Sequence, residues 1–108
     1  MIVLQTGHFI VIEGLDGAGT TTQAKMLTDW LRDRGQTACM TAQPSDGPIG
    51  RFIRRVLRGE ELGTNGETMD PAAIAGLFVA DRADHIVSVI SPALNAGHVV
   101  VCDRYVHS

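Results

Sequence analysis

The chain has little excess charge of either sign, only one lysine and no long apolar run. Its 108 residues carry nine Lys and Arg against twelve Asp and Glu, a net charge of −3. Because proteins that bind nucleic acid usually present a basic face to the phosphates, this balance argues against nucleic acid as the main partner. No apolar run approaches the ~20 residues that span a bilayer, and the N-terminal residues do not have the pattern of a signal peptide. We therefore expect a cytoplasmic protein without a membrane partner.

Cysteine is scarce as well. Cys39 and Cys102 each lie in an apolar, β-branched context, and neither has a neighbouring Cys or His at metal-ligand spacing. Such isolated thiols fit reduced, buried side chains better than a disulfide. With 44% hydrophobic and 19% charged residues, the chain has the composition of one small globular domain.

Apolar runs and helical patterns alternate along the chain. Strands are expected over 8–13, 37–41 and 99–102, and helices over 20–34, 49–58 and 70–89. The first run is continuous and therefore suited to burial on both faces. Strands that alternate with helices predict a parallel sheet with right-handed crossovers, an α/β fold of three layers. In such sheets ligands bind beyond the carboxyl ends of the strands.

The third predicted helix has the clearest start. Asp70 suits the N-cap position and Pro71 the first helical position, whereas Pro92 should kink or end the helix. Apolar side chains that recur at roughly helical spacing should form its buried face. These are Ile74, Leu77, Phe78, Ala80 and Ile86.

A glycine-rich segment follows the first predicted strand. Gly14 and Gly19 have the spacing of the motif G-x-x-x-x-G-K-[ST], in which backbone N–H groups and a helix N-terminus surround phosphate oxygens. We expect this loop to bind a nucleotide phosphate, and the alternative is a structural turn. Thr21 occupies the hydroxyl position that usually ligands Mg²⁺. The candidate ATP-binding residues are Gly14, Leu15, Asp16, Gly17, Ala18, Gly19, Thr20, Thr21 and Thr22.

Thr20 stands where this motif has lysine. A unit charge about 4 Å from a phosphate contributes about 4 kcal/mol at an effective dielectric of 20, so its loss should be felt. Lys25 is the only lysine in the chain and lies more than one helical turn further on. An arginine, or a group outside these residues, would have to supply the charge.

Asp103 directly follows the last apolar run. In phosphate-loop proteins an Asp at this place commonly ends a strand beside the first one, with its carboxylate near the metal. The alternative is a loop cap or an ion pair with Arg104. The planar guanidinium of Arg104 suits a phosphate.

Arg82 follows Phe78 by four residues and shares its helical face. An aromatic ring with an arginine beside it can bind a base, although a Phe on a helix is more often part of the core. Spacing alone leaves both interpretations open.

Taken together, these segments make the chain similar to the N-terminal part of a thymidylate kinase. The matching segments are 9–23, 43–54, 77–85 and 102–108, of which the last two are specific to this family among nucleoside monophosphate kinases. The resemblance covers nearly the whole chain but about half of the family's usual length. It implies a P-loop NTPase fold of the nucleoside monophosphate kinase type. It also implies transfer of the γ-phosphoryl group of ATP, with Mg²⁺, to thymidine 5′-monophosphate (dTMP) in dTTP biosynthesis.

The resemblance also implies individual roles. Phe78 would stack on thymine, Arg82 would contact the base edge, and Arg54 and Arg104 would hold the acceptor monophosphate region. The implied catalytic residues are Asp16, Asp103 and Arg104, and the implied metal ligands are Thr21 and Asp103. Asp16 would lie near the sugar 3′-hydroxyl. Because the family is usually dimeric, a homodimer is expected for the full-length protein.

The chain departs from the family pattern in two residues and in length. Thr20 replaces the loop lysine, and Ala42-Gln43-Pro44 stands where Arg-Glu-Pro is common, so the site lacks two cations. This leaves two alternatives open, a kinase for another deoxynucleotide and a non-catalytic nucleotide-binding module. Past Ser108 the family continues with the rest of the thymidine pocket, a lid and two more strands. We expect residues 1–108 to be one incomplete domain with an unpaired edge on the first strand, poorly stable and inactive alone.

Overall fold

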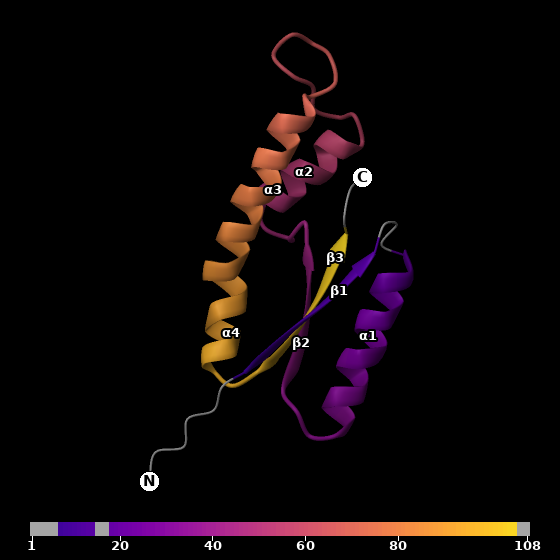
Figure 1. Cartoon of the computed structure of the whole chain (residues 1–108), viewed down its shortest axis with the longest axis vertical. Helices are drawn as coiled ribbons and strands as arrows, with labels where there is room; N and C mark the ends of the chain where they lie inside the picture. Colours follow the sequence, from indigo (N-terminus) through magenta and orange to yellow (C-terminus); the bar gives the residue numbers. More distant parts are fainter. Residues whose placement is uncertain (1–6, 15–17, 106–108) are drawn as a thin grey trace.

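The computed structural model describes residues 7–14 and 18–105 (Figure 1). They form one three-stranded parallel sheet in the order β1-β3-β2, surrounded by helices. The elements are β1 (His8–Gly14), α1 (Ala18–Asp33), β2 (Ala38–Gln43), α2 (Pro48–Leu57), α3 (Pro71–His85), the π-helical turn η1 (Ile86–Ile90), α4 (Ser91–Asn95) and β3 (Val99–Tyr105). The predicted α/β fold is confirmed.

The third strand lies in the centre of the sheet. It pairs with β1 along one side and with β2 along the other, and both pairings are parallel. Val99–Cys102 is therefore buried throughout. The register places Glu13 and Gln43 on either side of Arg104, so the polar ends of the three strands meet at one edge of the sheet.

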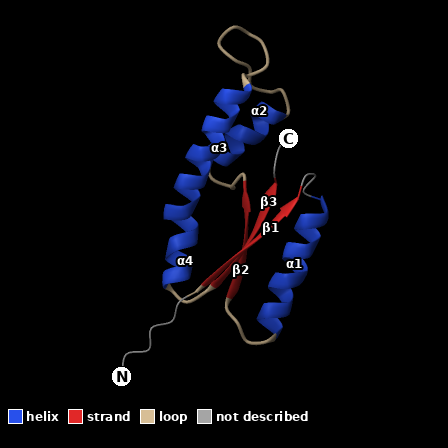
Figure 2. Ribbon diagram, viewed as in Figure 1, coloured by secondary structure: helices blue, strands red, loops and turns tan. Residues whose placement is uncertain are grey.

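Helix α1 covers one face of the sheet, and α3, η1 and α4 run in line on the other side (Figure 2). The core under α1 contains Ala24, Ala38, Val99 and Val101, all buried. Leu27 and Leu31 of α1 pack against this cluster, so the helix has an apolar stripe that faces the sheet. Within the described ranges, no helix has the length and apolar character that crossing a bilayer requires.

The prediction that the first strand is buried on both faces is wrong. Phe9 is 36% and Val11 is 39% exposed. The reason is that, among the described strands, β1 pairs only with β3 and so lies at the edge of the sheet. The predicted unpaired edge of this strand is confirmed.

The start of the third helix is as predicted, because the Ala72 N–H donates to Asp70 Oδ2 over 2.8 Å at the N-cap. Its predicted buried face is partly wrong, since Ala80 is exposed and Ile86 is 42% exposed. The buried side chains of α3 are Asp81 and His85. Periodicity of apolar residues misses this face because its contacts are hydrogen bonds.

The helix does not end near Val89. It passes through η1, and α4 continues to Asn95. Pro92 lies in the first turn of α4 and therefore does not end the helix. Gly97 has a φ of 82° and closes the segment.

Both cysteines are free thiols. Cys102 is buried, and burial raises its pKa to about 12, so the thiol stays protonated near neutral pH. Cys39 is only half-buried, because it lies on the outer strand β2.

Candidate functional site

A side-chain hydrogen bond at the carboxyl edge of the sheet joins α1 to β3. Thr21 Oγ1 donates to Asp103 Oδ2 over 2.5 Å, across 82 residues of sequence. Asp103 is 9% exposed, and its Oδ1 is buried and accepts no hydrogen bond from the described residues. A buried carboxylate oxygen of this kind is suited to a hard cation, which prefers oxygen ligands.

These two residues fit a Mg²⁺ ion that is bound mainly by other groups. No cluster of three or more His, Cys, Asp or Glu side chains in 7–14 and 18–105 is arranged to hold a metal. Mg²⁺ commonly takes one or two protein oxygens and completes its shell with substrate phosphates and water. A hydroxyl and a carboxylate beside a phosphate-binding loop are consistent with that arrangement.

The glycine-rich segment lies between β1 and α1. Leu15, Asp16 and Gly17 lie outside the described residues, so their predicted roles stay predictions. Ala18 and Gly19 begin α1, and Thr22 is exposed one turn further on.

Thr20 is 7% exposed and packs against the end of β1. A Cβ atom on Gly14 would lie 2.4 Å from Thr20 Cγ2, so only glycine fits at that position beside this threonine. The residue that replaces the motif lysine is thus part of the packing between strand and helix.

Arg104 forms an ion pair with Glu13 and not with Asp103. Its Nη1 donates to Glu13 Oε1 over 3.0 Å, between neighbouring positions of β1 and β3. The two side chains are 26% and 54% exposed. Partly exposed ion pairs contribute little, about 0–1 kcal/mol, so the guanidinium could exchange this carboxylate for a phosphate at low cost.

Arg54 lies on α2 and braces the turn that follows β2. Its Nη1 donates to the Ser45 carbonyl oxygen over 2.9 Å and to Asp46 Oδ1 over 3.2 Å. Its Nη2 donates to the Pro44 carbonyl oxygen over 2.5 Å. Arg54 is therefore held at the turn after β2 by its own hydrogen bonds, and its role in binding the acceptor phosphate stays a prediction.

Two residues that have no assigned role in the sequence prediction fix the same region from α3. Asp81 accepts from the Ser45 N–H and the Ser45 hydroxyl, over 2.7 and 2.6 Å. Gln43 Nε2 donates to His85 Nδ1 over 3.0 Å, so the His85 Nε2–H donates to Thr41 Oγ1, at 2.6 Å. Both helix residues are buried. The available indication in the sequence is that Asp81 and His85 are four residues apart and so share a helical face.

Burial lowers the pKa of His85, and the nearby carboxylates of Asp81, Asp84 and Asp46 oppose this only in part. A neutral ring is what the contacts require, because Nδ1 accepts a hydrogen bond. We expect the free energy of unfolding of the full-length protein to fall as the pH drops below about 6.5. The unfolded chain takes up a proton at the ordinary histidine pKa, whereas the folded chain does so only at lower pH.

Urea unfolding at about pH 7.5 and about pH 5.5 measures this effect. His85→Gln should reduce the loss of stability on acidification, and His98→Gln, on the segment before β3, serves as the matched control. An unchanged pH dependence in His85→Gln would contradict the prediction.

The remaining two predicted substrate residues lie on α3. Phe78 is half-buried and Arg82 is exposed. No hydrogen bond or ion pair among the described residues joins them to Arg54 or Arg104. The positions of Phe78 and Arg82 relative to those arginines therefore depend on how α3 is held against the rest of the fold.

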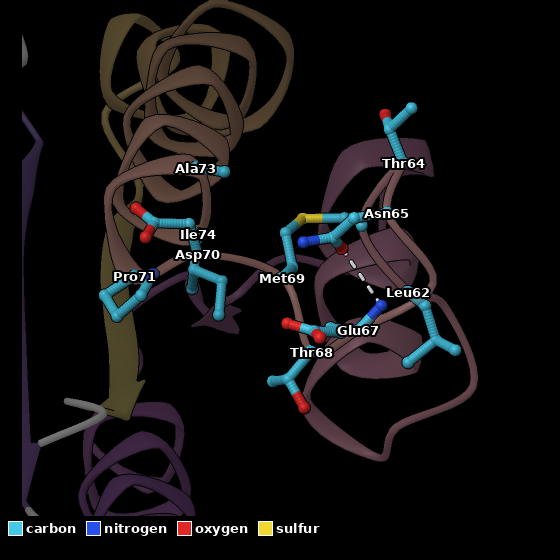
Figure 3. A pocket seen from close by; sticks show the side chains of 11 residues that line it. Leu62, Thr64, Asn65, Glu67, Thr68, Met69, Asp70, Pro71, Ala73 and Ile74 are labelled. Carbon is cyan, nitrogen blue, oxygen red and sulfur yellow. Dashed lines mark hydrogen bonds between the residues drawn. The ribbon is translucent and has the colours of Figure 1, made fainter.

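One pocket of the described residues contains none of the predicted site residues. It has a volume of about 880 Å³ and lies in the loop between α2 and α3, lined by Leu62, Met69 and Ile74 among others (Figure 3). A second pocket of about 510 Å³ lies between the turn after β2 and α3, where Asp46, Asp84 and His85 contribute to its wall.

Comparison with known proteins identifies the family. The sequence profile described as thymidylate kinase matches residues 12–108. The chain belongs to the thymidylate kinase family. A probable thymidylate kinase from Pyrococcus horikoshii is 48% identical over 102 residues, which cover 94% of this chain and 49% of the relative. A thymidylate kinase from Desulfotalea psychrophila is 40% identical over 99 residues, which cover 92% and 46%.

The fold of this thymidylate kinase family member is also found in a solved structure. The crystal structure of thymidylate kinase from Ehrlichia chaffeensis superposes with a TM-score of 0.76 at 28% identity, over 93% of this chain and 54% of that one. The P-loop NTPase fold that the family resemblance implies is thus confirmed. The chain spans about half the length of the curated thymidylate kinases that it matches.

Proposed function

We propose that the full-length protein phosphorylates dTMP to dTDP with ATP and Mg²⁺, a step in dTTP biosynthesis. The observation that carries the proposal is the contact between Thr21 of the phosphate-binding segment and the buried carboxylate of Asp103. It brings the two candidate metal ligands together at the edge where α/β proteins bind nucleotides. Membership of the thymidylate kinase family supports the choice of acceptor.

Residues 1–108 would form one incomplete P-loop kinase domain within that protein. The support is the share of the relatives that the chain covers, about half, and the edge of β1, which has no partner on one side among the described strands. Alone, this part is expected to be inactive and poorly stable. A cytoplasmic location is proposed with the function, because ATP and free nucleotides are available there.

The donor site would be the segment 14–22 together with Asp103. Backbone N–H groups at the start of α1 would bind the ATP phosphates, since a helix N-terminus favours anions. Thr21 and Asp103 would hold Mg²⁺, which neutralises charge on the phosphates when it is bound. Asp16 would act near the sugar of the acceptor.

The acceptor site would be formed by four side chains, Arg54, Phe78, Arg82 and Arg104. Phe78 would stack on the thymine ring and Arg82 would contact its edge. Arg104 would release Glu13 to meet the monophosphate, and Arg54 would keep the turn after β2 in shape beside it. Phosphoryl transfer requires aligned donor and acceptor oxygens and neutralised charge more than covalent help from the protein.

A non-catalytic nucleotide-binding module is the second candidate. Thr20 favours it, because its short side chain packs against Gly14 and brings no charge to the phosphates. Gln43 does not add support for the non-catalytic module. The residue is 8% exposed and its side-chain amide is hydrogen-bonded to His85, so Gln43 has a structural role.

The decisive experiment is a coupled kinase assay of the full-length protein with ATP and Mg²⁺. Three acceptors are compared, dTMP, dUMP and dCMP. Preferential turnover of dTMP is expected. Preference for dCMP would favour a kinase for another deoxynucleotide, and nucleotide binding without turnover would favour the non-catalytic module.

We also propose that the full-length protein is a homodimer that pairs through α3. Exposed small or apolar residues recur along one side of α3 and η1 at helical spacing. They are Ala72, Gly76, Val79, Ala83 and Val87. Val79 is 68% and Val87 is 73% exposed, which is unusual for side chains that lie on one stripe of a monomer. Sedimentation equilibrium tests the proposal, and a monomer at micromolar concentration would contradict it.

A further inference from the structure

The face that α3 turns toward β2 is polar and buried. Asp81 is 1% and His85 is 2% exposed. The Asp81 carboxylate accepts hydrogen bonds from the N–H and from the hydroxyl of Ser45. His85 forms hydrogen bonds with Gln43 and Thr41. Helix α3 is thus joined to the end of β2 and to its turn by four hydrogen bonds, and Figure 1 shows the helix passing beside that turn.

Ser45 is the centre of this connection because two helices, α3 and α2, fix it. From α3, the Asp81 carboxylate holds its N–H and its hydroxyl. From α2, Arg54 binds its carbonyl oxygen. Gly50 approaches so closely that a Cβ there would lie 2.0 Å from the same oxygen. The Ser45 hydroxyl also accepts from the Gly47 N–H over 3.1 Å, so the turn cannot move independently of α3.

The bond to Ser45 also fixes where the two candidate base-binding residues lie. Phe78 is three residues before Asp81 and Arg82 is one after it. A slip of α3 by one residue would move both by about 1.5 Å along the helix and turn them by about 100°. Buried polar contacts with defined geometry resist such slips, because an unpaired buried carboxylate costs far more than a lost apolar contact.

We propose that Asp81 is a positioning residue that sets the distance between the base subsite on α3 and the phosphate subsite at the turn braced by Arg54. A nucleoside monophosphate must reach both subsites at once, so this distance selects acceptors of the right length. The inference rests on the proposed function. Asp81 acts through Phe78 and Arg82 on one side and through Ser45 on the other, without touching the acceptor.

Thymidine, which lacks the phosphate, provides the test. It can fill the base subsite alone, whereas dTMP needs both subsites in register. A variant that loses the correct distance should therefore bind dTMP more weakly and thymidine almost as well as before. General damage to the fold would weaken both.

Isothermal titration of the full-length protein with dTMP and with thymidine measures this difference. Asp81→Ala is expected to weaken dTMP binding about tenfold, equivalent to about 1.4 kcal/mol, and thymidine binding less than about twofold. Asp81→Asn should restore most dTMP affinity, because its Oδ1 can accept from the Ser45 N–H while its Nδ2 donates to the Ser45 hydroxyl. Asp84→Asn is the control for loss of charge and should bind both ligands normally, because Asp84 lies one turn along α3 and accepts a hydrogen bond from Ser88 rather than from Ser45.

Equal weakening of dTMP and thymidine in Asp81→Ala would overturn the inference, and so would unchanged binding of both. If Asp81→Ala does not fold, Ser45→Ala decides. It removes one of the two bonds, so an approximately threefold loss for dTMP alone supports the inference and an unchanged dTMP affinity overturns it. A wild-type protein that binds neither ligand contradicts the proposed function itself, which separates that failure from a failure of the variants.

Discussion

Replacing Asp103 with asparagine is expected to lower the turnover of dTMP by the full-length protein about hundredfold to thousandfold, the usual effect of removing one charge-stabilising group. The carboxylate is buried, its Oδ2 accepts from Thr21 Oγ1, and its Oδ1 is the buried oxygen that we assign to Mg²⁺. Asparagine keeps the shape and loses the charge. The variant should also require a higher Mg²⁺ concentration for half-maximal rate.

Steady-state rates over a Mg²⁺ titration test this prediction, with melting curves to confirm that the variant is folded. Asp29→Asn is the matched control, because Asp29 is an exposed carboxylate on α1 whose contact with Arg32 is long, at 4.0 Å. Wild-type turnover in Asp103→Asn at every Mg²⁺ concentration would exclude Asp103 from the metal site.

Replacing Thr20 with lysine is expected to tighten the binding of ATP with Mg²⁺ at least about tenfold. A full charge about 4 Å from phosphate is worth about 4 kcal/mol at an effective dielectric of 20, and part of this is offset by desolvation of the ammonium group. Thr20 lies where the loop meets α1, and a lysine side chain is long enough to extend from that position toward the phosphates.

Isothermal titration of the full-length protein with ATP and Mg²⁺ provides the measurement. Met26→Lys adds the same charge to the exposed side of α1, where Met26 is 65% exposed, and should change the affinity little. Undetectable binding in the wild type, restored by Thr20→Lys, would mean that no other cation compensates for Thr20. Measurable wild-type binding that Thr20→Lys leaves unchanged would contradict our prediction and would show that the charge is already supplied.

The fold and the contact between Thr21 and Asp103 were predictable because both depend on local patterns. Alternating apolar runs and amphipathic segments define the parallel sheet, and Thr21 and Asp103 are anchored directly to its edge. Once the two strands are neighbours, the contact between these side chains follows from their positions at the carboxyl end. A contact between residues that are far apart in the sequence can therefore be predicted when both lie near the ends of neighbouring strands.

The polar face of α3 could not be predicted in the same way. Helical periodicity identifies faces by their apolar residues, and here the buried positions are Asp81 and His85. Their partners lie 36 to 44 residues earlier, at the end of β2 and in the turn after it, and the shape of that turn depends on Arg54 and Gly50. Likewise, the exposure of Phe9 and Val11 depends on what lies beside β1, which an apolar run cannot reveal.

The π-helical turn between α3 and α4 has a consequence for comparing this protein with its relatives. The buried positions along the helix are Asp81, His85 and Ile90, so the step is four residues and then five. One additional residue is accommodated inside the helix by the wider turn. A relative with one residue fewer between 86 and 90 would keep both buried surfaces in line by forming an ordinary α-helical turn. Gaps in an alignment of this region therefore belong within the helix at η1, where a single insertion changes no contact at either end.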